Sequence, residues 1–212
     1  MLMSGTAPKN RLHYGEPGTN SVVARVLLRQ TSPKQTGATI QVMSVPKLYL
    51  FVGYPGAGKS HVARLIAEQT GAVHLWADIV RQQMFEKPCH SRAESKQLYD
   101  RLNAETRDLL LDGKSVIFDT NFNYYDDRQL LRSIADEANA RTVLVWVTTP
   151  ESVAHSRAVH APVTRNGYTV NITADDFARM VGNLQAPRTA ELAVEIDGTN
   201  LRPEEVYQAL AI

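Results

Sequence analysis

The chain has one cysteine, Cys89, and six histidines that lie scattered along its 212 residues. A single cysteine excludes an internal disulfide, so nothing in the sequence requires an oxidising compartment. The histidines and the cysteine also show no zinc-ligand spacing. No apolar run approaches the roughly 20 residues that a membrane-spanning helix needs. We therefore expect a cytoplasmic protein that does not insert into a membrane.

An excess of charge of one sign is also missing, because the formal net charge is only +1. The residues before Lys47 carry +4, so the rest of the chain carries −3. Proteins that bind long nucleic acids usually present a basic surface. The acidic balance after Lys47 therefore argues against such a partner, although it leaves a local basic groove open. No feature of the sequence requires an obligate protein partner.

Residues 1–45 show no sustained helical or alternating pattern, and Gly, Pro, Ser and Thr recur throughout them. The exception is a short apolar stretch from Val22 to Leu28. This composition predicts a disordered extension. Its basic, nearly acid-free character faintly resembles an organelle transit peptide. We favour a simpler interpretation, in which the start is mis-assigned and translation begins at Met43. The main domain is then expected at 46–212.

From Lys47 onward, short apolar runs alternate with longer amphipathic ones. Five runs predict strands, the first of them continuous and apolar as in a buried parallel sheet: Leu48–Val52, Val73–Trp76, Ser115–Phe118, Thr142–Thr148 and Leu192–Ile196. Helices are predicted between and after them at Lys59–Gln69, Ile79–Phe85, Ala93–Leu111, Asp126–Asn139 and Pro203–Ala211. Two more are expected after Thr149, as N-cap with Pro150 at the first helical position, and after Thr173. Strands that each lead into a helix predict an α/β fold with a parallel sheet.

The segment Gly53-Tyr54-Pro55-Gly56-Ala57-Gly58-Lys59-Ser60 fits the phosphate-binding P-loop pattern in full. Glycines allow the backbone to turn so that consecutive N–H groups face phosphate oxygens. The helix that follows directs its positive end to the same place. The pattern predicts that an ATP site is made by Gly53, Gly56, Ala57, Gly58, Lys59, Ser60 and His61. Lys59 is expected to reach the β- and γ-phosphates, and Ser60 to bind Mg²⁺.

Two carboxylates follow predicted strands at the edge where a parallel sheet binds ligands. Asp78 comes just after the second strand, where it could orient an attacking hydroxyl toward the γ-phosphate. Arg81 lies three residues further on, on the same face of the expected helix. Asp119 follows the third strand. Two roles are open for Asp119: it holds Mg²⁺, directly or through water, or it braces Arg81.

Together the P-loop, the Asp78-Ile79-Val80-Arg81 step, the Asp119-Thr120-Asn121 step and Arg128 resemble the kinase domain of phage-type polynucleotide 5′-kinase. The wider group that they resemble is a set of small AAA-labelled P-loop kinases, including zeta-toxin-like and other metabolite kinases. The resemblance covers about 47–187. It implies a three-layer P-loop NTPase fold of the nucleotide-kinase type, with a five-stranded parallel sheet in the order 2-3-1-4-5 and a helical lid.

The same resemblance implies roles for individual residues. Asp78 would be the general base, Arg81 would contact the acceptor-side phosphate or the reacting oxygens, and Asp119 would orient Arg81. A lid at about 151–187 would supply arginines to the transferring phosphoryl group, and here Arg157 is the stronger candidate and Arg165 the weaker. The family's close arginine pair is not preserved, because the second position holds His160 or Ala161. Asp197-Gly198-Thr199 is either an adenine-binding segment or a plain turn.

These residues predict an ATP- and Mg²⁺-dependent kinase that transfers the γ-phosphoryl group to a hydroxyl. Lys59, Asp78, Arg81, Asp119 and Arg157 are the predicted catalytic residues, and Ser60 and Asp119 the predicted metal ligands. The acceptor is open between a small molecule and a nucleic-acid 5′ end. The alternative is a P-loop ATPase or regulatory switch with no phosphoryl acceptor. That alternative needs a water-positioning residue and a partner surface, and neither stands out in the sequence.

Overall fold

The computed structural model describes residues 45–160, 163–165, 168–170 and 172–212, all of which lie within one compact unit. The expected N-terminal extension falls on 1–44 and so lies outside the described residues. At the centre is a five-stranded parallel sheet in the order β2-β3-β1-β4-β7. Counting these strands along the chain, the order is 2-3-1-4-5, as predicted.

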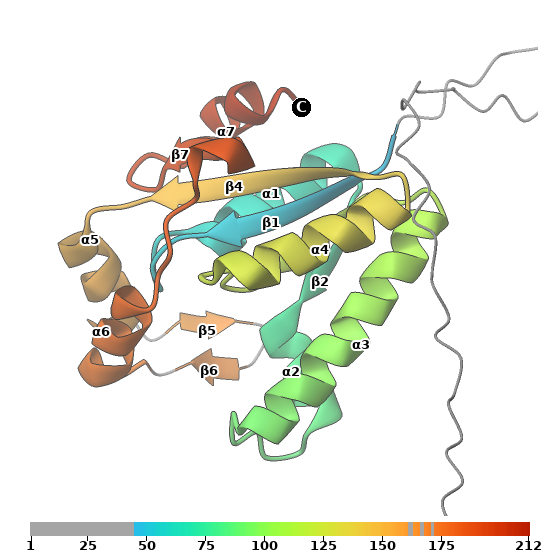
Figure 1. Ribbon diagram of the computed structural model, residues 1–212. Helices are drawn as coiled ribbons and strands as arrows, with labels where there is room; N and C mark the ends of the chain where they lie inside the picture. Colours follow the sequence, from blue (N-terminus) through green and yellow to red (C-terminus); the bar gives the residue numbers. More distant parts are fainter. Residues whose placement is uncertain (1–44, 161–162, 166–167, 171) are drawn as a thin grey trace, which may run out of the picture. The chain divides into compact units, whose positions relative to one another are not determined.

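The elements of the sheet and its flanking helices are shown in Figure 1. The strands are β1 (Lys47–Val52), β2 (Val73–Trp76), β3 (Val116–Asp119), β4 (Arg141–Thr148) and β7 (Val194–Asp197). The helices that follow them are α1 (Lys59–Thr70), α2 (Ala77–Met84), α3 (Arg92–Leu111), α4 (Tyr125–Glu137) and α7 (Pro203–Leu210). The predicted strands and helices are therefore confirmed, with small shifts at their ends.

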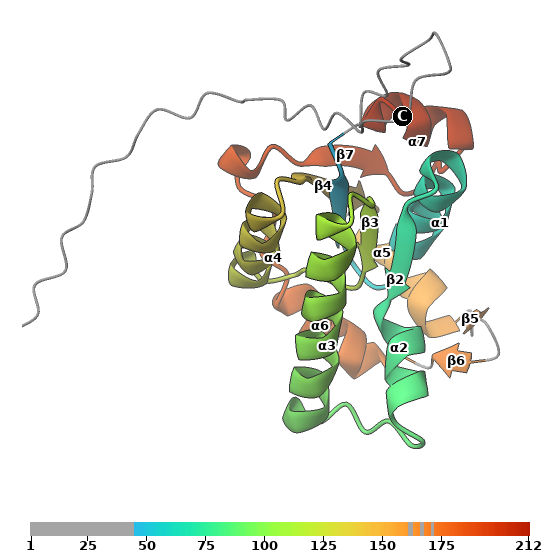
Figure 2. The same cartoon turned by 90° about the vertical axis from the view of Figure 1, so that its right-hand side faces the viewer.

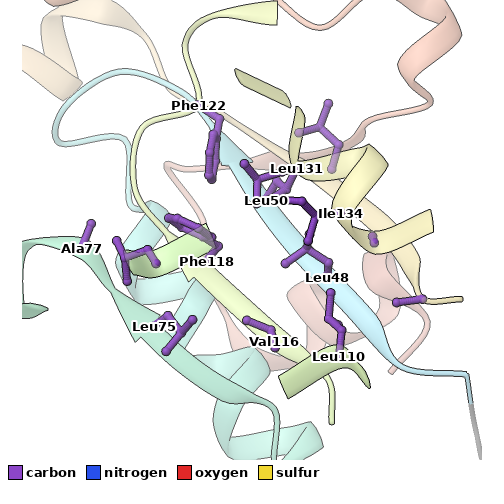
Figure 3. Close-up of a cluster of buried hydrophobic side chains, with 14 of the residues drawn as sticks. Leu48, Leu50, Leu75, Ala77, Leu110, Val116, Phe118, Phe122, Leu131 and Ile134 are labelled. Carbon is purple, nitrogen blue, oxygen red and sulfur yellow. The ribbon is translucent and has the colours of Figure 1, made fainter. Parts of the chain in front are cut away.

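Alternation along the buried strands divides the core into two layers, one on each face of the sheet. On one face, Leu48 and Leu50 of β1 belong to one cluster with Leu110 of α3 and Leu131 of α4 (Figure 3). On the other face, residues of β1 such as Phe51 pack against α1 and α7. Side chains of successive strand residues point to opposite faces, so one apolar strand serves both layers. Helices on both faces of a parallel sheet make the predicted three-layer α/β fold.

The segment expected to be a lid, 151–187, contains more than helix. It begins with α5 (Glu151–His155), which continues as a π-helical turn over Ser156–His160. A small antiparallel hairpin follows, formed by β5 (Val163–Arg165) and β6 (Tyr168–Val170), and then α6 (Ala174–Gly182). Figure 2 shows the hairpin beyond the C-terminal end of the π-helical turn. The sequence analysis did not predict this hairpin, because three-residue strands carry almost no alternation pattern.

Two expected boundaries are wrong. Pro150, and not Thr149, is the N-cap of α5, because the Thr149 hydroxyl is used elsewhere: it donates to the Ala57 carbonyl of the P-loop at 3.0 Å. The last strand begins at Val194, since Leu192 has left-handed backbone angles at the end of a 3₁₀ helix over Thr189–Glu191. The expected N-cap at Thr173 is confirmed, with its hydroxyl accepting from the Asp176 amide.

Candidate active site

The P-loop connects β1 to α1, and two of its glycines occupy positions where any other residue would be strained or would clash. Gly56 has φ of 78°, and a Cβ atom there would lie 2.3 Å from the Ala154 carbonyl oxygen. Gly58 is the N-cap of α1 and has φ of 109°. Both values lie in a region that side chains strongly disfavour. The glycine spacing read from the sequence is therefore needed for the turn into α1 and for its close packing against α5.

Lys59 and Ser60, the first two residues of α1, lie at the centre of the site. The Lys59 ammonium is largely buried and donates to the carbonyls of Gly53 at 2.8 Å and Tyr54 at 2.7 Å. The Ser60 hydroxyl donates to Oδ1 of Asp119 at 3.2 Å. Asp119 is the last residue of β3, which lies next to β1 in the sheet. The carboxyl ends of adjacent parallel strands thus bring together the predicted metal ligands Ser60 and Asp119.

A histidine that the sequence analysis did not single out completes this group. His74 of β2 shares a hydrogen bond of 3.0 Å between its Nε2 and Oδ2 of Asp119. Its ring stacks on the indole of Trp76, with centroids 5.6 Å apart and planes 1° from parallel. His74 and Trp76 are two residues apart on β2, so strand alternation places them on the same face. Strand alternation, together with the position of Asp119 on the neighbouring strand, could have indicated from the sequence that His74 belongs to the site.

A pocket of about 150 Å³ opens between these elements. The predicted site residues that line it are Gly56, Gly58, Lys59, Ser60, Asp78, Asp119 and Arg157. Trp76, Thr120 and Asn121 contribute to its wall as well. Gly53, Ala57 and His61 do not line it; Ala57 is fully buried, and His61 Nδ1 accepts from Arg64 at 2.8 Å. The pocket combines a P-loop, a Ser–Asp oxygen pair and the accessible carboxylate of Asp78.

Arg157 approaches the site from the π-helical turn. Its Nη1 donates to the Gly198 carbonyl at 2.8 Å, so it is held beside the turn that follows β7. In that turn Oδ1 of Asp197 accepts from the amide and the hydroxyl of Thr199, which lowers the pKa of Asp197. The side chain of Arg165, the weaker candidate, lies outside the part of the chain that the structure describes. Arg157 is thus the lid arginine found at the pocket.

Arg81 is not where the resemblance implied. It is buried, and its Nη1 contacts Oε1 of Glu94 on α3 at 2.5 Å, with Ser95 as a weaker partner at 3.4 Å. It does not contact Asp119, whose carboxylate oxygens pair with Ser60 and His74 instead. The expectation that Asp119 braces Arg81 is therefore wrong. The physical reason is the placement of α3, which brings a second carboxylate closer to the guanidinium.

No cluster of three or more His, Cys, Asp or Glu side chains suited to a metal occurs among the described residues. Among the oxygen donors that line the pocket, the Ser60 hydroxyl and the Asp119 carboxylate lie within hydrogen-bond distance of each other. Both are hard oxygen ligands, and Mg²⁺ in ATP-dependent enzymes is commonly held by one or two protein oxygens with water and substrate phosphates. The residues present fit Mg²⁺ bound in that manner. Within the described part of the chain, no helix is both long and apolar enough to cross a membrane.

Comparison with known proteins adds a family and a fold. A family model described as an AAA domain matches residues 48–187. No curated protein matches the chain. A crystal structure of a protein from Chloroflexus aurantiacus is similar with a TM-score of 0.63 and 17% identity, covering 80% of this chain and 96% of that one.

Two kinases are among the similar solved structures. The APS kinase CysC of Mycobacterium tuberculosis, in complex with AMPPNP and APS, has a TM-score of 0.55 and 22% identity over 79% of this chain and 99% of its own. A gluconokinase from Sinorhizobium meliloti has a TM-score of 0.55 and 22% identity over 80% of this chain and 91% of its own. At these identities the likeness shows a shared fold.

Proposed function

Because this chain belongs to the AAA-domain family, whose model matches residues 48–187, we propose that it is an ATP-dependent kinase acting on a hydroxyl group. One observation carries the proposal: the P-loop residues Lys59 and Ser60 and the carboxylates of Asp78 and Asp119 line a single pocket. A phosphoryl transferase needs a group that orients the attacking hydroxyl, and the exposed carboxylate of Asp78 lines the same pocket as the P-loop.

In the proposed reaction, the P-loop and Lys59 bind the phosphates of ATP, and Asp78 accepts the proton of the acceptor hydroxyl. The freed oxygen forms a bond to the γ-phosphorus as the bond to the β–γ bridging oxygen breaks, which leaves ADP. Ser60 and Asp119 would hold Mg²⁺, which neutralises charge on the phosphates when it is bound. Arg157 lines the pocket, where its positive charge would stabilise the transferring group.

The acceptor class stays between a small hydroxyl compound and a nucleic-acid 5′ end. Trp76, Thr120 and Asn121 are the pocket residues nearest in sequence to Asp78 and Asp119, and they are the candidates for contacting the acceptor. The test is an acceptor screen with γ-labelled ATP and Mg²⁺, with 5′-hydroxyl oligonucleotides and pools of nucleosides, sugars and other metabolites. Transfer of label to an acceptor supports the kinase. Release of phosphate with no labelled acceptor would favour the ATPase or switch.

The substitution Asp78→Asn tests the base directly. An amide keeps the shape of the side chain but does not accept a proton, so we expect ATP affinity to stay within about twofold while transfer falls by roughly 10²–10⁴-fold. Asp108→Asn is a matched control, because Asp108 is exposed on α3. Full transfer activity in Asp78→Asn would remove Asp78 from the role of base.

A further inference from the structure

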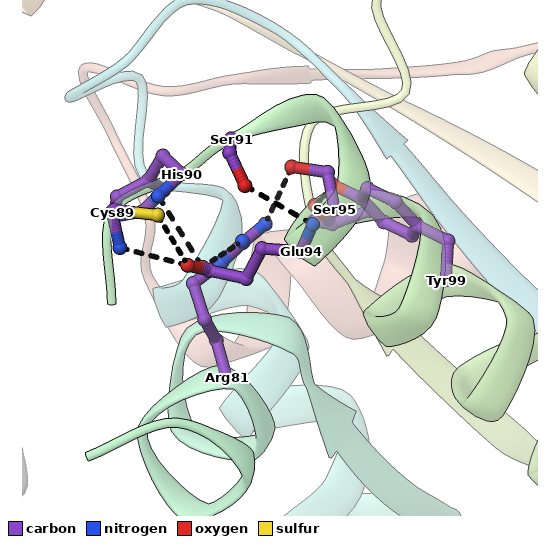
Figure 4. Close-up of polar contacts among 8 residues, drawn as sticks. Arg81, Cys89, His90, Ser91, Glu94, Ser95 and Tyr99 are labelled. Atoms are coloured by element: carbon purple, nitrogen blue, oxygen red, sulfur yellow. Dashed lines mark hydrogen bonds and ion pairs between the residues drawn. The ribbon is translucent and has the colours of Figure 1, made fainter. Parts of the chain in front are cut away.

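Glu94, at the start of α3, binds donors from two other parts of the chain (Figure 4). Its Oε1 accepts from Arg81 of α2 at 2.5 Å and from the His90 amide at 3.3 Å. Its Oε2 accepts from the Cys89 amide at 2.8 Å and from the Cys89 thiol at 3.1 Å. Cys89 and His90 belong to the loop 85–91 that connects α2 to α3. One carboxylate therefore joins α2, this loop and α3.

The hydrogen-bond donors around Glu94 stabilise the charged form of its carboxylate. Glu94 and Arg81 are both almost fully buried, with 6% of each residue exposed. Burial opposes ionisation, but the hydrogen bonds from the Cys89 amide, Arg81, the Cys89 thiol and the His90 amide outweigh it and lower the pKa of Glu94 to about 2. A buried guanidinium without its partner charge would be strongly unfavourable. The two side chains therefore keep each other in place.

Fixing Arg81 also fixes the helix that carries Asp78. Helix α2 has only eight residues, and helices this short gain most of their stability from packing. Asp78 lies in its first turn and Arg81 in its last. The Arg81–Glu94 ion pair is a buried polar link between α2 and α3. A change in that link would move α2 and, with it, the carboxylate of Asp78 at the pocket.

Helix α3 also contacts a residue that lines the pocket. The Tyr99 hydroxyl and the Thr120 hydroxyl are hydrogen-bonded at 3.1 Å, and Thr120 lines the pocket. Glu94 and Tyr99 are five residues apart on α3, and the helix itself is anchored to the sheet by Leu98 and Leu102. One rigid element thus contacts both the helix that carries Asp78 and the segment that follows Asp119.

We propose that Glu94 is a positioning residue for phosphoryl transfer, which acts through Arg81 to hold Asp78 at the pocket. The proposal rests on the proposed function. It gives Glu94 the role of bracing Arg81 that the family resemblance assigned to Asp119. Because misplacement of a reacting group by about 1 Å lowers rates by roughly 100-fold, loss of the brace should reduce transfer without removing ATP binding.

The test is a double-mutant cycle of Arg81→Gln and Glu94→Gln, with kcat/KM for the acceptor found in the screen and the Kd for MgATP measured on each variant. If Glu94 acts through Arg81, each single change lowers kcat/KM by roughly 10–100-fold, the double variant is no worse than the worse single one, and the Kd for MgATP stays within twofold. Asp108→Asn is the control on the same helix. Effects that multiply in the double variant, or Glu94→Gln with wild-type kcat/KM, would overturn the proposal.

Two further measurements separate this proposal from the proposed function. Cys89 is the only cysteine, so its rate of reaction with Ellman's reagent reports on the loop 85–91 alone. Glu94→Gln should raise that rate several-fold, since the thiol loses its charged acceptor and the anionic reagent no longer meets the Glu94 charge. This result is expected even if no acceptor is phosphorylated, and an unchanged rate contradicts the brace.

The second measurement applies if Glu94→Gln does not fold. Arg81→Lys keeps the positive charge but loses the planar fork of donors, so its kcat/KM should fall as far as that expected for Glu94→Gln. Wild-type kcat/KM in Arg81→Lys would count against the brace.

Discussion

At the scale of single residues, Asp119 is held from two sides. One carboxylate oxygen accepts from Ser60 and the other pairs with His74. Such outer partners fix the direction of a metal ligand and often change metal affinity by roughly 10–100-fold when they are removed. We therefore expect His74 to act on the predicted Mg²⁺ site, although β3 lies between its strand and β1 in the sheet.

We predict that His74→Phe raises the Mg²⁺ concentration for half-maximal transfer by roughly 10-fold. Phenylalanine keeps a flat ring against Trp76 but offers no hydrogen bond to Asp119. Titration of activity with MgCl₂ at fixed ATP measures the shift, and Asp119→Asn should shift it at least as far. Glu68→Gln on the exposed side of α1 is the control. An unchanged Mg²⁺ dependence in His74→Phe would mean that the contact does not orient the ligand.

Glu94 makes a second residue-scale prediction, about stability and pH. Its pKa in the folded protein is about 2, below the ordinary 4.5, so folding favours the ionised form. The stabilisation is therefore complete above pH 4.5 and is lost as the pH falls from 4.5 toward 2. Urea midpoints should differ most between wild type and Glu94→Gln at neutral pH, and the difference should shrink below pH 4.5. A difference that stays constant down to pH 2.5 would contradict the ion-pair account.

At the scale of elements, a second buried ion pair joins α4 to the segment before β7. Arg128 contacts Glu191 through two bonds of 2.8 Å, and it also donates to the carbonyls of Phe122 and Gln185. Only 1% of Arg128 is exposed. Phe122 follows β3, and Gln185 and Glu191 lie between α6 and β7. Arg128 therefore links these two segments, and we assign the pair a structural role.

Removing one partner of a fully buried pair commonly lowers the free energy of unfolding by about 3–5 kcal/mol, because the other charge stays buried. We predict a loss of this size for Arg128→Met, measured by urea denaturation. Arg101→Met, on the exposed side of α3, should change stability by no more than about 0.5 kcal/mol. The double variant Arg128→Met with Glu191→Met should recover part of the loss. A small effect of Arg128→Met alone would show that water reaches the pair.

The elements of the central sheet could be predicted from the sequence because their patterns are local. The strand from Leu48 and the helix from Lys59 depend on apolar periodicity and on glycine spacing, both of which lie within a few residues. The partners of Arg81 and Arg128 are different. They are 13 and 63 residues away along the chain, and no local pattern says which carboxylate a buried arginine will meet. The sequence therefore does not predict these two ion pairs, because they depend on how α3 and the segment before β7 pack.

At the scale of the whole molecule, the pocket draws its residues from segments that are far apart in the sequence. The P-loop follows β1, Asp78 lies in the first turn of α2, Asp119 ends β3 and Arg157 belongs to the π-helical turn after α5. A ligand that contacts all four segments binds the folded state and not the unfolded chain. Its binding free energy therefore adds to the stability of the entire unit.

We predict that MgATP at about 100 times its Kd adds about 2.7 kcal/mol to the free energy of unfolding. For a chain of this size that corresponds to a rise in Tm of roughly 5–10 °C, measured by thermal denaturation. Lys59→Ala should abolish the rise, because the phosphates lose the ammonium that lies beside the P-loop carbonyls. Asp78→Asn should keep it, since Asp78 is assigned to the acceptor and not to ATP. If Asp78→Asn lost the rise as Lys59→Ala does, Asp78 would belong to the nucleotide site, and the division of the pocket into donor and acceptor sides would be wrong.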